Sequence, residues 1–147
     1  MKLSQLENNI KNKKSFLCLG LDSDIDKIPK HLLSNSDPVF EFNKILIDEL
    51  NKKIVAVKLN TAFYESRGAA GWRSMEKTIN YLNKFYPELF TIADAKRGDI
   101  GNTSKMYAKA FFENLNFDSI TLSPYMGMDS VSECMDCLFI HISEPTR

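Results

Sequence analysis

The sequence predicts an α/β protein built on a parallel sheet, and three observations support this. Short apolar runs rich in β-branched and aromatic residues alternate with longer segments of helical spacing, each run ends in a polar loop, and no linker interrupts the pattern before about residue 130. Such alternation is typical of βα units whose parallel strands are covered by helices. Four units suit either an open doubly wound sheet or part of an eight-stranded barrel, and periodicity does not separate the two.

The first two units follow one another directly along the chain. Residues 16–21 form an apolar run that predicts a strand, and a Pro-containing connection leads to a helix over 39–52, where apolar residues recur at helical spacing. The second strand is predicted over 54–59. A Gly-containing loop then leads to a helix over 73–85, which a nearby proline ends.

The third and fourth units are shorter. A strand is predicted over 90–95, a helix over 103–115 and a last strand over 118–124. In both candidate folds the chemistry gathers where the parallel strands end. The side chains expected at this rim are Asp22, Lys58, Asp94, Lys96 and Ser123. For Ser123 we favour a turn-forming role, because a strand-ending Ser-Pro pair commonly forms a turn.

Composition restricts the function only loosely. Lys+Arg and Asp+Glu both number 19, so net charge favours neither nucleic acid nor an anionic membrane as partner. No apolar run resembles a secretion signal or a membrane span, which predicts a cytoplasmic protein. Cys18 is expected to pack as a small hydrophobe inside its strand. Cys134 and Cys137, with His141, lack an obvious fourth ligand, and we expect no metal there.

The strongest local signal is Asp-Ala-Lys-Arg-Gly-Asp at residues 94–99, which starts in a strand and continues into a loop. Asp94 and Lys96 are two residues apart and share a strand face, so their charges are expected to pair. A lysine held between carboxylates keeps its proton, which favours a general acid over a Schiff-base nucleophile. Lys58 is expected to join this cluster. The alternative is a structural ion-pair network at the rim of the sheet.

Residues 93–103 resemble the long form of the D-x-K-x-x-D signature of orotidine 5'-monophosphate decarboxylases. The resemblance runs from about residue 16 to 131 and is similar to the longer-chain bacterial branch. Its other motifs are Gly20-Leu21-Asp22, Phe40-Glu41-Phe42-Asn43-Lys44, Lys58-x-Asn60 and Ala62-Phe63-Tyr64-Glu65 with Gly71-Trp72. The resemblance implies a TIM (β/α)8 barrel, here about its first four βα units. It also implies decarboxylation of orotidine monophosphate to uridine monophosphate in pyrimidine synthesis, without metal or organic cofactor.

The resemblance implies a role for each matching position. Lys96 matches the lysine that protonates the ring carbon as carbon dioxide leaves, and Asp94 matches the carboxylate beside it. Asp99 matches a second aspartate, which in this family reaches across a homodimer interface into the partner's site, together with the residue at Thr103. Two further positions match ribose contacts, namely Asp22 and Lys58.

The match to the family ends near residue 131. Residues 1–131 are therefore expected to be the N-terminal part of a decarboxylase barrel, and 132–147 a divergent tail in which 138–142 is a candidate surrogate strand. In half a barrel the first and last strands lack neighbours, which exposes backbone edges and apolar faces. We therefore expect this chain alone to bind orotidine monophosphate weakly and to turn over little of it.

Two other functions stay open at this point. One is a magnesium-dependent sugar-phosphate aldolase or decarboxylase of the same superfamily, which shares D-x-K-x-x-D, and metal dependence of activity would identify it. The other is a non-catalytic fragment that associates with an intact subunit. Mixing the chain with a full-length enzyme and measuring mass and activity would identify that case.

Overall fold

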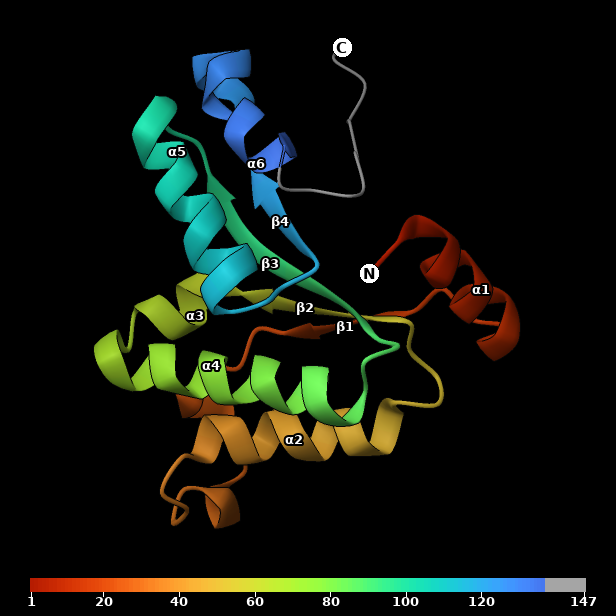
Figure 1. The fold of residues 1–147 in the computed structure, drawn as a ribbon. Coiled ribbons are helices and arrows are strands. Elements are labelled where there is room, and N and C mark those ends of the chain that lie inside the picture. Colours follow the sequence, from red (N-terminus) through yellow and green to blue (C-terminus); the bar gives the residue numbers. More distant parts are fainter. Residues whose placement is uncertain (137–147) are drawn as a thin grey trace.

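The computed structural model describes residues 1–136 and contains one sheet of four strands in the order β1-β2-β3-β4 (Figure 1). All neighbouring strands pair in parallel. The strands are β1 (Cys18–Leu21), β2 (Ala56–Asn60), β3 (Phe90–Arg97) and β4 (Ser119–Leu122). Within the described part of the chain, β1 and β4 each have a sheet neighbour on one side alone. The predicted α/β fold with four βα units is confirmed.

Helices connect and flank these strands. They are α1 (Leu3–Lys13), α2 (Pro38–Leu50), α3 (Thr61–Glu65), α4 (Gly68–Phe85), α5 (Gly101–Ala108), which continues as a π-helical segment (Lys109–Asn114), and α6 (Ser132–Asp136). Short 3-10 turns cover Ile25–Lys27, Lys30–Leu32, Pro124–Met126 and Met128–Ser130. The helices predicted between the strands are confirmed, whereas α1 was not predicted and α3 lies where a loop was expected.

One face of the sheet packs against α2 and α4, which run side by side (Figure 1). The strands contribute buried apolar side chains that include Leu21, Val57 and Leu59, and the helices contribute Ile47 and Ile79. Burial of this apolar surface is the main stabilising contribution to such a layer. The helix layer therefore holds the strands in place from one side.

The start of α2 shows how its sequence places this helix. The Asp37 carboxylate accepts a hydrogen bond from the backbone N–H of Phe40, and Pro38 occupies the first helical position. Both features are favoured at helix N-termini, because the cap satisfies a free N–H and proline has none to satisfy. Lys77 of α4 forms an ion pair with the same carboxylate at 3.1 Å, which ties the two helices together.

The opposite face of the sheet is largely uncovered within the described residues. Alternation along β1 turns Leu21 toward the helices, whereas Cys18 and Gly20 are exposed. The prediction that Cys18 packs inside its strand is therefore wrong, because its side chain points to the face opposite α2 and α4 and is exposed there. Lys58 and Asp94, which belong to this face, remain partly accessible.

α1 lies at the opposite end of the sheet from α3 (Figure 1). Its residue Leu6, together with Met1, packs against Ala56 and Phe90 at the beginnings of β2 and β3. α1 carries apolar residues at helical spacing, although none of its residues is buried. It covers the end of the sheet away from the charged rim.

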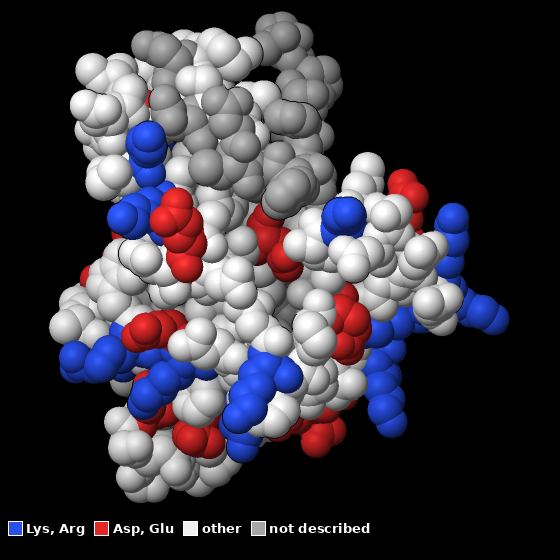
Figure 2. All heavy atoms as spheres, in the orientation of Figure 1, with Lys and Arg blue, Asp and Glu red and all other residues white. Residues whose placement is uncertain are grey.

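The molecular surface carries both signs of charge. Figure 2 shows acidic and basic side chains interspersed on one face, in line with the 19 residues of each sign in the sequence. Among residues 1–136, no helix combines the length and the apolar character needed to cross a membrane.

Candidate active site

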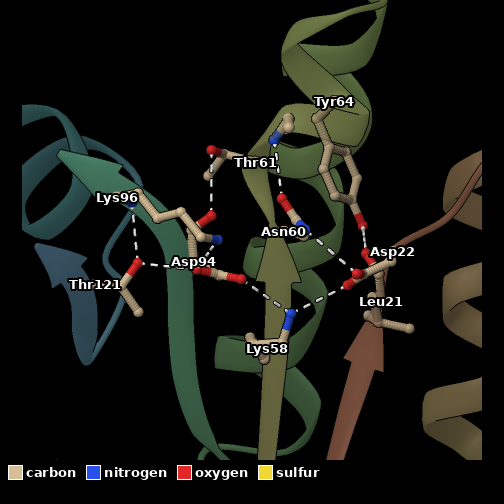
Figure 3. A network of polar contacts seen from close by, with 10 residues as sticks. Leu21, Asp22, Lys58, Asn60, Thr61, Tyr64, Asp94, Lys96 and Thr121 are labelled. Atoms are coloured by element: carbon tan, nitrogen blue, oxygen red, sulfur yellow. Dashed lines mark hydrogen bonds and ion pairs between the residues drawn. The ribbon is translucent and has the colours of Figure 1, made fainter. Parts of the chain in front are cut away.

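Three neighbouring strands bring two acids and two lysines together at the rim of the sheet (Figure 3). Asp22 follows β1, Lys58 lies in β2, and β3 carries Asp94 and Lys96. The Lys58 ammonium lies 3.2 Å from Asp22 Oδ1 and 3.2 Å from Asp94 Oδ2. The Lys96 ammonium lies 2.6 Å from Asp94 Oδ1. The charges thus alternate in sign from β1 to β3, and the predicted pairing of Asp94 with Lys96 and the inclusion of Lys58 are both present.

Asp94 is the least accessible member of this charged cluster of Asp22, Lys58, Asp94 and Lys96. Its side chain is 13% exposed, against 67% for Lys96. Partial burial acts to raise the pKa of Asp94, but hydrogen bonds from Lys96, Thr121 and Lys58 outweigh it and hold this pKa below its usual value. Asp94 is therefore ionised at neutral pH.

Lys58 responds to the same surroundings in the opposite sense. Desolvation acts to lower its pKa, but hydrogen bonds to Asp22 and Asp94 and the attraction of both carboxylates outweigh this and raise the pKa above its usual value. Lys58 is thus a fixed positive charge between two fixed negative ones. Such a group binds or orients anionic and hydroxyl-bearing ligands more readily than it acts as a base.

Two further polar side chains belong to the cluster, and neither was among the predicted site residues. Thr121 of β4 donates a hydrogen bond to Asp94 Oδ1 and accepts one from the backbone N–H of Lys96, each at 3.0 Å. Asn60 at the end of β2 donates to Asp22 Oδ2 at 3.3 Å. Asn60 lies two residues after Lys58, so strand alternation was a signal that could have identified it.

The backbone of β3 departs from regular pairing where the charged residues lie. Ala93 pairs with Ile120 and Arg97 with Leu122, so four residue steps on β3 face two on β4. Within this bulge Lys96 has a φ of +49°, in the left-handed region that side-chain-bearing residues avoid. Left-handed backbone costs about 1 kcal/mol for such a residue. Bulges of this kind re-aim a side chain, here the lysine toward the rim.

Arg97 anchors the far end of the bulge on the helix side. Its guanidinium forms an ion pair with Glu65 of α3 and lies 5.3 Å and 5.8 Å from the ring centroids of Tyr107 and Phe111. Its Nη1 group also donates to the backbone carbonyl of Ala95 at 3.0 Å. Arg97 therefore faces away from Lys96 and fixes the strand against the helices.

Gly98 follows directly and allows β3 and β4 to approach closely. A Cβ atom added at Gly98 would lie 2.3 Å from the carbonyl oxygen of Ser123, far inside van der Waals contact. The Ser123 N–H also donates to the Arg97 carbonyl at 2.6 Å. A residue with a side chain at position 98 would therefore push the two strands apart. Ser123 precedes the turn at Pro124–Met126, as its turn-forming role predicts.

A buried polar network supports the chain beneath Asp22. The Tyr64 hydroxyl donates to the Leu21 carbonyl at 3.1 Å and accepts from Asn43 Nδ2 at 3.0 Å. Ser23 donates to the carbonyl oxygen of the same Asn43 side chain. Tyr64 is fully buried, and burial raises its pKa to about 12. Residues on both sides of Asp22 are thus held from the core.

Asp99 and Thr103 are not part of the charged cluster. The Asp99 carboxylate accepts a hydrogen bond from the next residue, Ile100, at 2.8 Å, and Thr103 is exposed near the start of α5. Within residues 1–136, no hydrogen bond or ion pair joins either side chain to Asp94 or Lys96. The sheet therefore assembles one part of the predicted site and leaves these two residues apart from it.

The cysteine and histidine pattern near the C-terminus is only partly described. Cys134 is buried beside Ser104, with 3.9 Å between the sulfur and the hydroxyl oxygen. Cys137, His141 and the candidate strand over 138–142 lie outside the described residues, so the interpretations placed on them stay predictions.

Comparison with known proteins places this arrangement in a family. The family model for orotidine 5'-phosphate decarboxylase / HUMPS matches residues 15–138. The orotidine 5'-phosphate decarboxylase of Flavobacterium johnsoniae is 64% identical over 131 residues, which cover 89% of this chain and 48% of that protein. That of Christiangramia forsetii is 60% identical over 136 residues, or 92% of this chain and 50% of that protein. The chain thus spans about half the length of the curated relatives it matches.

Solved structures agree with the sequence relatives. The Leishmania donovani OMP decarboxylase superposes with a TM-score of 0.77 and 35% identity, over 92% of this chain and 50% of that chain. The UMP synthase of the same organism superposes with a TM-score of 0.76 and 35% identity, over 92% of this chain and 28% of that chain. This likeness confirms the predicted TIM-barrel class, of which the chain holds four βα units. The chain belongs to the orotidine 5'-phosphate decarboxylase / HUMPS family.

Proposed function

We propose that this chain carries the proton-donating part of an orotidine 5'-monophosphate decarboxylase site, which converts orotidine monophosphate to uridine monophosphate and carbon dioxide. The observation that carries the proposal is the Lys96 ammonium 2.6 Å from the Asp94 carboxylate, which the Lys58 ammonium contacts from the other side. The names of the curated relatives support the choice of reaction and substrate.

The reaction needs a positive charge and a proton at one carbon. The bond from the ring carbon to the substrate's carboxylate breaks, carbon dioxide leaves, and the electron pair stays on the ring carbon, which then takes a proton from the Lys96 ammonium. A charge at about 4 Å in an effective dielectric near 20 contributes roughly 4 kcal/mol, on the order of a thousandfold in rate. Because this charge develops during bond breaking, Lys96 favours the transition state over bound substrate.

The other members of the charged cluster prepare Lys96 for this step. Asp94, with its lowered pKa, stays ionised and holds the Lys96 ammonium at 2.6 Å. It would also lie beside the substrate's carboxylate and disfavour the bound ground state. Asp22 and Lys58 are assigned to the ribose hydroxyls, since they present an acceptor and a donor at the edge of the cluster.

Asp99 and Thr103 are assigned to the neighbouring site of a homodimer. Support comes from their position, since neither side chain contacts the Asp94–Lys96 pair within residues 1–136. The assignment is tested in a hybrid enzyme in which this chain replaces the matching half of the Flavobacterium johnsoniae relative. Inactive Lys96→Ala and Asp99→Ala hybrids should regain activity when they are mixed, because one mixed site then holds both native residues. If the mixed hybrids stay inactive, the assignment of Asp99 to a site shared between two subunits is contradicted.

The same hybrid tests the reaction itself. With orotidine monophosphate, we expect stoichiometric uridine monophosphate and carbon dioxide, and a loss of about a thousandfold or more in kcat/KM for Lys96→Ala. Lys52→Ala, which removes an exposed lysine in the turn after α2, is the matched control and should leave the rate unchanged. Full activity of Lys96→Ala would contradict the proposal.

The magnesium-dependent alternative makes a different prediction for the same assay. A divalent cation needs free carboxylate oxygens, whereas Asp22 and Asp94 both contact the Lys58 ammonium. We therefore expect unchanged decarboxylation after treatment with a chelator. Loss of activity that magnesium restores would favour the magnesium-dependent aldolase or decarboxylase instead.

A further inference from the structure

We propose that Thr121 is a positioning residue that holds Asp94 and Lys96 in their working arrangement through a single hydroxyl group. The effect of Thr121 on catalysis rests on the proposed function, whereas its hydrogen bonds to Asp94 and Lys96 do not depend on it. Thr121 lies on β4, the strand beside the one that carries both charged residues. Neither the D-x-K-x-x-D signature nor any other motif quoted for the resemblance includes Thr121.

The bulge in β3 creates the need for such a residue. Four residue steps on β3 face two on β4 between the pairs Ala93–Ile120 and Arg97–Leu122, so the backbone groups of the bulge lack regular partners across the ladder. Such backbone groups need hydrogen-bond partners from outside the ladder. The Lys96 N–H donates instead to the Thr121 hydroxyl at 3.0 Å.

The same hydroxyl acts on the carboxylate. A threonine hydroxyl has one hydrogen to donate and lone pairs to accept. Here it accepts from the Lys96 backbone and donates to Asp94 Oδ1 at 3.0 Å, the oxygen that also contacts the Lys96 ammonium at 2.6 Å. One atom therefore links the left-handed backbone of Lys96 to the acid that holds its side chain (Figure 3).

The two carboxylate oxygens of Asp94 are oriented from different strands. Lys58 orients the other oxygen of Asp94, Oδ2, from β2, while Thr121 orients Oδ1 from β4. Asp94 is thus gripped from both neighbouring strands, and its rotation is restricted in both directions. Thr121 reaches no reacting atom in this scheme and acts through Asp94 and Lys96.

The test titrates Asp94 in the full chain by carbon-13 NMR of labelled aspartate side chains. Thr121→Val keeps the shape and removes the hydroxyl, Thr121→Ser keeps the hydroxyl, and Ser119→Ala removes a β4 hydroxyl that bonds the Thr91 carbonyl instead. We expect the Asp94 midpoint to rise by about one pH unit in Thr121→Val, a tenfold change in proton affinity. Thr121→Ser and Ser119→Ala should leave it unchanged. An unchanged midpoint in Thr121→Val overturns the proposal.

A second measurement needs no variant, in case Thr121→Val does not fold. Hydrogen exchange on the unmodified chain should show the Lys96 amide protected, since its N–H is bonded to Thr121. Exchange at the rate of an unstructured peptide would overturn the proposal. Neither measurement depends on turnover. An inactive hybrid therefore leaves this inference standing, and a failed titration leaves the proposed reaction standing.

Discussion

The two ends of the Asp94–Asp99 stretch are held in very different ways. Asp94, at the strand end, accepts hydrogen bonds from side chains on three strands, namely Lys58, Lys96 and Thr121. Asp99, five residues later in the loop, accepts one from its own neighbour Ile100 among the described residues. The side chain at the strand end is thus held by this half of the barrel, whereas no other strand holds the Asp99 side chain within residues 1–136.

The largest expected effect comes from removing the acid at the strand end. Asp94→Ala removes the carboxylate between the ammonium groups of Lys58 and Lys96. The two positive charges then repel each other, and both side chains lose their fixed positions. We expect the hybrid enzyme to lose about a thousandfold or more in kcat/KM. Asp26→Ala, at an exposed position, is the control for removing one negative charge. A loss below tenfold would show that the strand end matters less than the loop.

The junction between strand and loop gives the next effect. Gly98→Ala places a methyl group 2.3 Å from the Ser123 carbonyl oxygen, so β3 and β4 must separate. We expect the free energy of unfolding to fall by about 1–3 kcal/mol in urea titrations. Gly20→Ala is the matched control, because the nearest atom to its added methyl would be Asp22 Oδ1 at 3.8 Å. Equal stability of the two variants contradicts this account.

The third prediction concerns pH. Because the folded-state pKa of Asp94 lies below its usual 3.8, the carboxylate stabilises the fold above that value, and this contribution is lost as pH falls through the folded pKa. Asp94→Asn should therefore unfold more easily than the unmodified chain at pH 7. The difference should shrink as pH falls from about 3.8 through the folded pKa of Asp94, because below that folded value both variants carry a neutral side chain. Urea midpoints at pH 7 and pH 3 measure it, and a constant difference would contradict the assignment.

The smallest expected effect isolates the backbone of the bulge. At a φ of +49°, glycine is less strained than any other residue, so Lys96→Gly should be more stable than Lys96→Ala by about 1 kcal/mol. Both variants lack the ammonium, so the comparison excludes the ion pair. Thermal or urea unfolding of the two variants is sufficient. A more stable alanine variant would show that position 96 does not hold a left-handed backbone.

The four strands and the pairing of Asp94 with Lys96 could be predicted, because apolar runs mark buried strands and two-residue spacing places side chains on one face. The orientation of Cys18 could not, because alternation identifies two faces but not which one the helices cover. α1 was not predicted, although Leu3, Leu6 and Ile10 recur at the spacing of one helix face, a signal that could have identified it.

The bulge in β3 and its hydroxyl partner, Thr121, could not be predicted from the sequence. Threonine is an ordinary strand residue, and nothing local to Thr121 distinguishes it from one that only forms a strand. Its role arises from a mismatch in register between β3 and β4, which is a property of two segments about 25 residues apart. The left-handed conformation of Lys96 is equally invisible in a sequence that has no glycine at that position.

The ion pair of Arg97 with Glu65, and its stacking on Tyr107 and Phe111, have a consequence for genetics. Adjacent codons specify Lys96, whose side chain points to the charged rim, and Arg97, whose side chain points to the helices. A loss-of-function selection should consequently recover substitutions at Tyr107 or Glu65, which lie outside the charged cluster, because they loosen the Arg97 anchor that orients the neighbouring lysine. Such a selection would find positions on the helix side of the sheet as well as at its charged rim.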